Sequence, residues 1–227
     1  MCVQIARVRR MSRRRAKAKV IFLDETKISV KEHRRRTLVA PGEQQFVVVD
    51  DSSAYAAKYD MIACCSADRV FPPKIYTPKD RAEIKVEGIR TFMLLDYIND
   101  ILAQAVAAID KYPLILVVDR ATIYNTKEIL EAFHEAGCED LEIVYLMPTN
   151  SAKRLSPLDN SLFHVWKNRV RQHHLITKTN IGQIMCDEWN KFTAEDIIPH
   201  YRNCGLVCGI DPYINCPDPF NHCHPKP

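Results

Sequence analysis

The stretch that decides the fold is LILVVDRATIYNTKEILEAF, residues 114–133. Residues 114–118 are all apolar, which is typical of a buried strand, and Asp119 follows them directly. Residues 126–136 then have the spacing of a helix, and Gly137 fits the C′ position that ends it. A buried strand, an acid at its end, a short loop and a helix predict a strand–helix unit of an α/β sheet.

The segments on both sides of this unit predict the same fold class. Apolar runs indicate strands, and apolar residues at helical spacing indicate amphipathic helices. The expected strands are 19–23, 45–50, 59–66, 114–118 and 142–146. The expected helices are 89–109, 126–136, 156–172, 180–190 and 193–201, the last with Thr193 as its cap, and loops are expected at 70–80 and 149–155. We therefore expect an α/β domain with a mixed five-stranded sheet flanked by helices on both faces.

Two of the strands end in an aspartate, Asp24 after VIFL and Asp119 after LILVV. Ligands of open α/β sheets gather at the carboxyl ends of strands, so these acids are expected to lie together if their strands are neighbours. Asp159 occupies the third position of a helix that Ser156 and Pro157 begin, and it can reach the same edge. Taken singly, each acid has a simpler interpretation, as a strand-end turn residue or as a capping acid.

Three converging carboxylates need a cation, because like charges raise one another's pKa. Hard oxygen donors suit Mg²⁺ or Mn²⁺. Two such ions would hold the attacking and leaving oxygens of a phosphoryl transfer. The residue pattern alone makes Asp24, Asp119 and Asp159 a candidate two-metal site.

Three segments of the chain resemble a known family in the order in which that family has them. They are IFLDET at 21–26, LILVVDRATIYNTKEILEAF at 114–133 and LMPTNSAKRLSPLDNSLFHVWKNRVR at 146–171. They are similar to the three catalytic blocks of the DDE/DDD transposases, in the mariner-like branch. The resemblance extends over roughly residues 19–205.

The resemblance implies an RNase H-like fold and a two-metal site of Asp24, Asp119 and Asp159. It implies hydrolysis of DNA at the ends of a transposable element, followed by attack of the freed 3′-hydroxyl on target DNA. It also implies a homodimer and no small-molecule cofactor. The second block departs from the family pattern, since Arg120 replaces an Asn and Tyr124 lies in the region of a His.

The resemblance and the composition together divide the chain into three parts. Residues 1–18 are a basic and flexible segment, 19–204 the catalytic domain, and 205–227 an irregular tail rich in Cys and Pro. Family members carry helix-turn-helix domains upstream, so we expect a catalytic core that lacks the usual N-terminal DNA-binding domain. The basic segment favours a nucleic-acid partner and nuclear import, with organellar targeting as the alternative. No run reaches membrane-spanning length, so no membrane partner is expected.

Four residues near the acids are candidates for supporting roles. Glu25 follows Asp24 and points away from it on an extended strand, which leaves it as a neighbour of the metal site or a purely local one. Asn160 could position a carboxylate or be an ordinary first-turn residue. Lys167 and Arg171, with Arg169 between them, could contact DNA phosphates or form a solvated basic face.

The nine cysteines are an odd number, which argues against a fully paired disulfide framework. Cys64, Cys65, Cys138 and Cys186 lie in apolar or helical contexts and are expected to be reduced core residues. The C-terminal candidates for a structural Zn²⁺ are Cys204, Cys208, Cys216, His222, Cys223 and His224. Their spacing fits no familiar zinc knuckle, so a packing role is expected for Cys204 and zinc is not expected.

Two other functions remain open at this level. The first is a domesticated or decayed transposase that binds DNA without cutting it. The second is another RNase H-like nuclease, such as one that acts on RNA–DNA hybrids. The acid triad favours an enzyme, and the third block favours a transposase over a hybrid nuclease.

Overall fold

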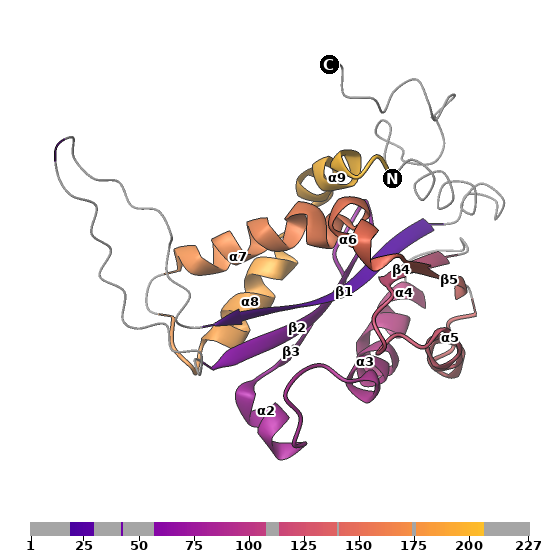
Figure 1. Cartoon of the computed structure of the whole chain (residues 1–227), viewed down its shortest axis with the longest axis horizontal. Helices are drawn as coiled ribbons and strands as arrows, with labels where there is room; N and C mark the ends of the chain where they lie inside the picture. Colours follow the sequence, from indigo (N-terminus) through magenta and orange to yellow (C-terminus); the bar gives the residue numbers. More distant parts are fainter. Residues whose placement is uncertain are drawn as a thin grey trace.

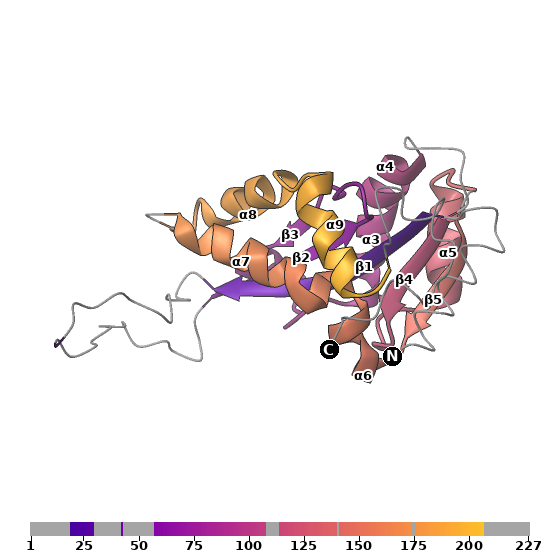
Figure 2. The ribbon, with the colours of Figure 1, turned by 90° about the horizontal axis from the view of Figure 1, so that it is seen from above.

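The computed structural model describes residues 19–29, 42, 57–107, 114–139, 141–173 and 176–206. A five-stranded sheet in the order β3-β2-β1-β4-β5 forms its centre (Figures 1 and 2). The strands are β1 (Lys19–Ser29), β2 (Lys58–Cys65), β3 (Lys74–Tyr76), β4 (Leu114–Asp119) and β5 (Leu141–Met147). β1 is antiparallel to β2 and parallel to β4, so the expected mixed five-stranded sheet is confirmed.

Helices cover both faces of the sheet, as expected (Figure 2). The segments of one face are α6 (Thr149–Leu155), η2 (Leu158–Leu162), α7 (Phe163–Gln172), α8 (Ile181–Asn190) and α9 (Ala194–Asn203). Those of the other face are α3 (Thr91–Tyr97), η1 (Ile98–Leu102), α4 (Ala103–Ala107) and α5 (Thr126–Glu135). A short helix, α2 (Pro78–Glu83), follows β3.

The core on the first face contains the even-numbered residues of β1, such as Phe22, packed against the aromatic residues of α7 and α8. Trp166 is fully buried, and its Nε1 donates to the Met185 carbonyl at 3.1 Å. Its ring meets Trp189 edge to face, with the centroids 6.5 Å apart. These contacts pack Trp166 in the core and fix α7 and α8 together over β1 and β2.

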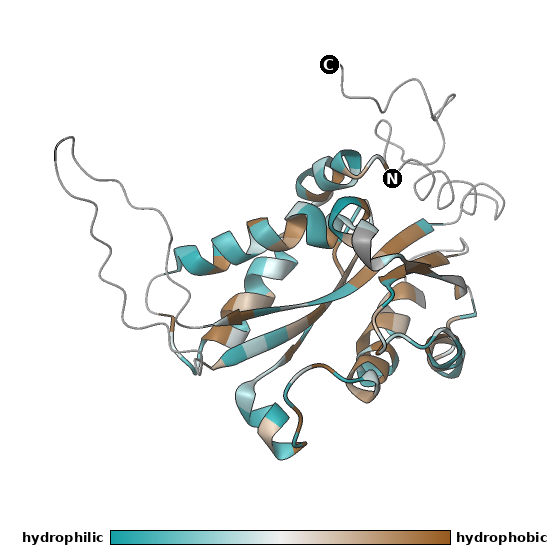
Figure 3. Ribbon diagram, viewed as in Figure 1, coloured by the Kyte–Doolittle hydropathy of each residue, from teal (hydrophilic) through white to brown (hydrophobic). Residues whose placement is uncertain are grey.

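The core on the second face contains the odd-numbered residues of β1, including Ile21 and Leu23, packed against α3, η1 and α5. Alternation along the strand therefore separates the two cores. β4 and the beginning of β1 are hydrophobic, whereas the second half of β1 and much of α7 and α9 are hydrophilic (Figure 3).

Three predicted helix ends are confirmed by their cap geometry. Gly137 has φ +77° just after α5, and its N–H donates to the His134 carbonyl at 2.9 Å. Ser156 accepts from the Asp159 N–H at 3.4 Å. The Thr193 hydroxyl accepts from the N–H of Asp196, whose carboxylate accepts in return from the Thr193 N–H.

Several predictions of secondary structure are wrong. The expected loop at 70–80 contains β3 and the start of α2, where Thr77 caps the helix and Pro78 occupies its first turn. The expected loop at 149–155 is α6. By contrast, the single helix expected at 89–109 is confirmed as one continuous helical stretch over residues 91–107, in which the π-helical turn η1 lies between α3 and α4. The strand expected at 45–50 lies outside the described residues.

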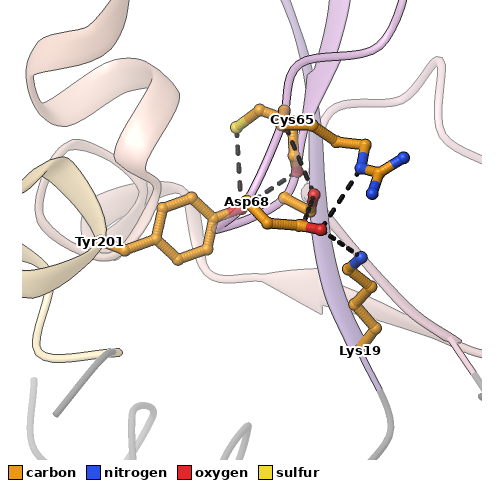
Figure 4. Close-up of polar contacts among 6 residues, drawn as sticks. Lys19, Cys65, Asp68 and Tyr201 are labelled. Atoms are coloured by element: carbon orange, nitrogen blue, oxygen red, sulfur yellow. Dashed lines mark hydrogen bonds and ion pairs between the residues drawn. The ribbon is translucent and has the colours of Figure 1, made fainter. Parts of the chain in front are cut away.

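A polar network ties α9 to the end of β2 (Figure 4). The Tyr201 hydroxyl donates to the Cys65 carbonyl at 3.0 Å and lies 3.7 Å from the Cys65 sulfur. In the turn that follows β2, Asp68 accepts from Ser66 at 2.6 Å and pairs with Lys19 at 2.8 Å. The Lys19–Asp68 pair joins the start of β1 to the turn after β2, and the Tyr201–Cys65 hydrogen bond joins the end of β2 to α9.

The cysteines that the structure describes are free. Cys64, Cys65, Cys138 and Cys204 are buried, and Cys186 is half-buried. The prediction of free core cysteines is confirmed for Cys64, Cys65 and Cys138, and so is the packing role of Cys204, whereas Cys186 is free but only partly buried. Among the described helices, none is long and apolar enough to cross a membrane.

Candidate active site

β1 places Asp24 at the centre of the sheet. The parallel ladder with β4 runs from the Lys19–Leu114 pair to the Phe22–Val117 pair, whereas the antiparallel ladder with β2 continues to Ser29. The sequence predicted that Asp24 ends its strand, and this is wrong. Pairing with β2 extends β1 beyond Asp24, as far as Ser29. Its side chain is buried, and Oδ1 accepts from the Glu25 N–H at 2.8 Å.

β4 places Asp119 beside Asp24. Asp119 is the last residue of its strand and lies two positions beyond the Phe22–Val117 pair, as Asp24 does on β1. Asp119 is half-buried, and its Oδ1 accepts from the Ala121 N–H at 2.8 Å. The expectation that the two acids lie side by side on neighbouring parallel strands is confirmed, although only Asp119 ends its strand.

Asp159 reaches this edge from the first turn of the helix that η2 and α7 form. Ser156 caps that turn, and the neighbouring Leu158 is buried against the β1 side of the core. The Asp159 side chain is exposed in part, yet it lies within hydrogen-bonding range of Asp24. Asp159 thus meets the other acids instead of lying on the far side of the sheet.

Asp24 and Asp159 resist ionisation in this site. Burial is the main reason that the pKa of Asp24 is well above its ordinary value, and the charges of Asp159, Glu25 and Asp119 raise it further. Burial and the Asp119 charge also raise the pKa of Asp159, against the opposing effect of its hydrogen bond with Asp24 and of Lys153 and Lys167. A bound divalent cation would relieve this repulsion.

The donor set suits a hard cation, because it consists of carboxylate oxygens. In the arrangement described, no three His, Cys, Asp or Glu side chains of the described residues form a ready coordination cluster. The backbone hydrogen bonds of Asp24 and Asp119 each use Oδ1.

Tyr124 is a residue of this region to which the sequence analysis assigned no role. Its hydroxyl donates to Oε2 of Glu25 at 2.5 Å, and its ring is buried in the core of the second face. Burial raises the pKa of Glu25, and it outweighs the hydrogen bond from Tyr124, which lowers that pKa. Glu25 points away from Asp24, as predicted. The only sequence signal for Tyr124 is its place in the region where the resembled family has a His.

The other candidates lie on the same helix as Asp159 or beside it. The Asn160 side chain donates to the Lys153 carbonyl at 3.1 Å and so ties η2 to α6. Lys167 and Arg171 lie one turn apart on α7, half-buried. Arg169 pairs with Asp196 at 2.9 Å and lies over the Phe192 ring, so its guanidinium has partners within the chain.

The predicted basic segment 1–18 and most of the C-terminal tail lie outside the described residues. Cys204 is the one zinc candidate that the structure describes, and it is buried in the core with Tyr201 and Leu206. Cys208, Cys216, His222, Cys223 and His224 lie outside the described residues.

The fold is similar to that of solved transposase structures. The chain is similar to the crystal structure of the catalytic domain of Mos1 mariner transposase, with a TM-score of 0.59 and 11% identity over 89% of this chain and 85% of that one. It is also similar to the Mos1 mariner paired end complex with Mn, with a TM-score of 0.67, 11% identity and coverage of 89% and 57%. For the Mos1 Strand Transfer Complex the TM-score is 0.66, with 13% identity and coverage of 89% and 56%. These likenesses confirm the RNase H-like fold class.

The sequence itself matches a family. The model of the DDE superfamily endonucleases covers residues 87–204, just over half of the chain, and includes Asp119 and Asp159. The chain belongs to the DDE superfamily endonucleases. It spans about 56% of the length of the Mos1 chain in the strand transfer complex. No curated protein matched the chain.

Proposed function

We propose that this chain is the catalytic core of a DDE/DDD-type transposase, which cleaves DNA strands and transfers them in a metal-dependent reaction. The observation that supports this most is the meeting of Asp24 and Asp159, from β1 and from η2, beside Asp119 at the end of β4. Three carboxylates from three separate segments are gathered at the edge of the sheet where α/β folds bind ligands.

In the proposed site Asp24, Asp119 and Asp159 would hold two Mg²⁺ or Mn²⁺ ions. When bound, such ions supply charge neutralisation at the phosphate and a metal-activated nucleophile. The chain's own residues would orient the ions and the DNA backbone, which is the protein's main contribution to phosphoryl transfer. The Mos1 complexes are described with Mn and with Mg, which supports these two metals.

DNA is the proposed substrate and partner. Mos1 structures of this fold are described as paired-end and strand transfer complexes, one of them with the left transposon end. Lys167 and Arg171 follow Asp159 along the same helix, one turn apart on α7, and their proposed role is to contact phosphates of the strand that is cut. A homodimer and action in the nucleus are further parts of the proposal, by analogy with paired-end assemblies and from the DNA substrate.

One observation favours the second candidate, a DNA-binding protein of the same origin without catalysis. Arg120 follows Asp119 directly and is exposed, which brings a cation to the edge where a metal would bind. A cation there lowers the affinity of the site for Mg²⁺ or Mn²⁺ by repulsion. The two candidates differ in whether DNA is cut, and one assay separates them.

The assay incubates the full chain with supercoiled plasmid and Mn²⁺ or Mg²⁺, beside the Asp119→Asn variant and a sample with EDTA. We expect nicked and linear plasmid with the wild type alone. Asp119→Asn is the matched control, because it keeps the shape of the side chain and removes a charge. Binding of plasmid by both proteins without any cleavage would overturn the enzyme and support the non-catalytic binder.

A further inference from the structure

We infer that Glu25 and Tyr124 form a positioning pair that fixes the first two acids of the proposed site, Asp24 and Asp119, relative to each other. The inference rests on the proposed function, since it concerns how that site holds a divalent cation. It adds two residues that do not coordinate metal and that act through those that do.

A continuous set of hydrogen bonds joins the two acids. The Glu25 N–H donates to Oδ1 of Asp24 at 2.8 Å, and the Glu25 carboxylate accepts from the Tyr124 hydroxyl at 2.5 Å. The Tyr124 N–H donates to the Ala121 carbonyl at 3.1 Å, and the Ala121 N–H donates to Oδ1 of Asp119 at 2.8 Å. Each acid is therefore oriented by a backbone N–H, and the Glu25–Tyr124 bond connects the two segments that supply those N–H groups.

The Glu25–Tyr124 hydrogen bond lies beyond the point where backbone hydrogen bonds join β1 to β4. The ladder between β1 and β4 ends at the Phe22–Val117 pair, before either acid is reached. Beyond that pair β1 continues beside β2 alone, and the chain after Asp119 turns away toward α5. Glu25 and Tyr124, 99 positions apart in the sequence, join β1 to this turn.

Asp24 and Glu25 point to opposite faces of β1. Asp24 lies on the face of α7 and η2, together with Asp159, whereas Glu25 points to the opposite face. There the Tyr124 ring is only 5% exposed, packed in the core with residues of α3 and α5. A buried ring in a packed core is a rigid support, so the bond holds the acids from behind the site without entering it.

Groups that orient metal ligands in this way affect metal affinity strongly. Losing one typically costs roughly 10–100-fold in affinity or activity. Tyr124→Phe removes only the hydroxyl and keeps the ring, so we expect the Kd for Mn²⁺ to rise by about 10-fold or more. Cleavage should require correspondingly more Mn²⁺ and recover in large part at saturating metal.

The matched control is Tyr97→Phe. Tyr97 is a fully buried tyrosine of the same core, and its hydroxyl donates at 3.0 Å to the Pro72 carbonyl, with no link to the acids. Both variants lose one hydroxyl hydrogen bond. Only Tyr124→Phe should weaken Mn²⁺ binding.

The test measures Mn²⁺ binding to the full-length variants by titration calorimetry, with thermal unfolding to show that each is folded. Glu25→Ala, whose side chain is half-buried, is a second route to the same loss, and the double variant Glu25→Ala/Tyr124→Phe should bind Mn²⁺ no more weakly than Glu25→Ala alone.

Wild-type Mn²⁺ affinity in Tyr124→Phe, an equal loss in Tyr97→Phe, or fully additive losses in the double variant would each overturn the inference. If the wild type cuts DNA while Tyr124→Phe binds Mn²⁺ normally, the positioning pair fails and the proposed function stands. If the wild type neither binds Mn²⁺ nor cuts DNA, both fail.

Discussion

The carboxyl group of Asp159, in the first turn of η2, lies beside the carboxyl group of Asp24 on β1. Together with burial, its charge keeps the pKa of Asp24 well above the ordinary value. The folded chain thus gathers negative charge in a place where water cannot fully stabilise it. Such an arrangement costs stability and is typical of sites built to bind a cation.

The first prediction concerns this cost. Asp24→Asn removes a buried group that Asp159 and Glu25 repel, so the metal-free variant should be more stable than the wild type. We expect the free energy of unfolding in EDTA at neutral pH to rise by about 1–2 kcal/mol in urea denaturation. Glu131→Gln, at an exposed position of α5, should change it by less than about 0.5 kcal/mol. A destabilised Asp24→Asn would contradict the prediction.

A second prediction is a pH dependence away from the site. Burial opposes ionisation of Glu188, but hydrogen bonds from Lys191 and His173 outweigh it and hold its pKa below the ordinary 4.5. The folded state therefore favours the carboxylate more than the unfolded chain does. The resulting stabilisation is fully present above about pH 4.5 and is lost as the pH falls through the lower pKa of the folded state.

Glu188→Gln measures this contribution. At pH 7 the variant should be less stable by roughly 1–3 kcal/mol, because hydrogen bonds to a charged group are lost. The difference should shrink as the pH is lowered below 4.5. Denaturation at several pH values checks this, with Glu135→Gln, exposed on α5, as the control. A difference that stays constant with pH would show that the ionised form of Glu188 adds nothing.

A third prediction concerns DNA binding. Lys167→Ala/Arg171→Ala should weaken DNA binding equally for all sequences, because contacts to phosphates do not read bases. The slope of log K against log salt should become shallower by about 2. Lys79→Ala/Lys127→Ala removes the same charge from α2 and α5, where both side chains are more than 80% exposed, and should change the slope little. Equal effects of both pairs, by fluorescence anisotropy, would disprove a specific DNA face on α7.

A fourth prediction tests the end of α5. Gly137 has φ +77° with no atom within 4 Å of an added Cβ, so Gly137→Ala meets backbone strain and no clash. The variant should lose about 1 kcal/mol of stability. Gly88→Ala, also without neighbours and without a positive φ, is the matched control. A thermal unfolding midpoint unchanged in Gly137→Ala would show that the turn is not held in this conformation.

The sequence predicts the parts of the fold that local rules determine. The strand–helix unit from residue 114 to Gly137 is predicted because a continuous apolar run, helical spacing and a C′ glycine agree. Ser156 and Thr193 are predicted as caps because Ser and Thr directly before a helical pattern are preferred N-cap residues. β3 is missed because three residues at a sheet edge have no detectable pattern, although Thr77, Pro78 and Asp80 form a readable capping box for α2.

The arrangement of the candidate site is harder to predict from the sequence than these elements. Asp24 and Asp119 follow from strand-end chemistry, but the reach of Asp159 depends on how η2 packs against β1, which is a tertiary contact. The extent of β1 is set by its partner β2 and not by its own residues. The Glu25–Tyr124 bond joins two segments that have no shared pattern, so no sequence rule indicates it.

The central claim is that Asp24, Asp119 and Asp159 together bind divalent metal ions. Anomalous diffraction from crystals of the full chain grown in Mn²⁺ tests it directly, with data collected above and below the manganese absorption edge. We expect manganese peaks bounded by these three carboxylates, and no such peaks in crystals of Asp119→Asn. Well-ordered crystals in saturating Mn²⁺ with no peak at these acids, or with peaks only elsewhere, would contradict it.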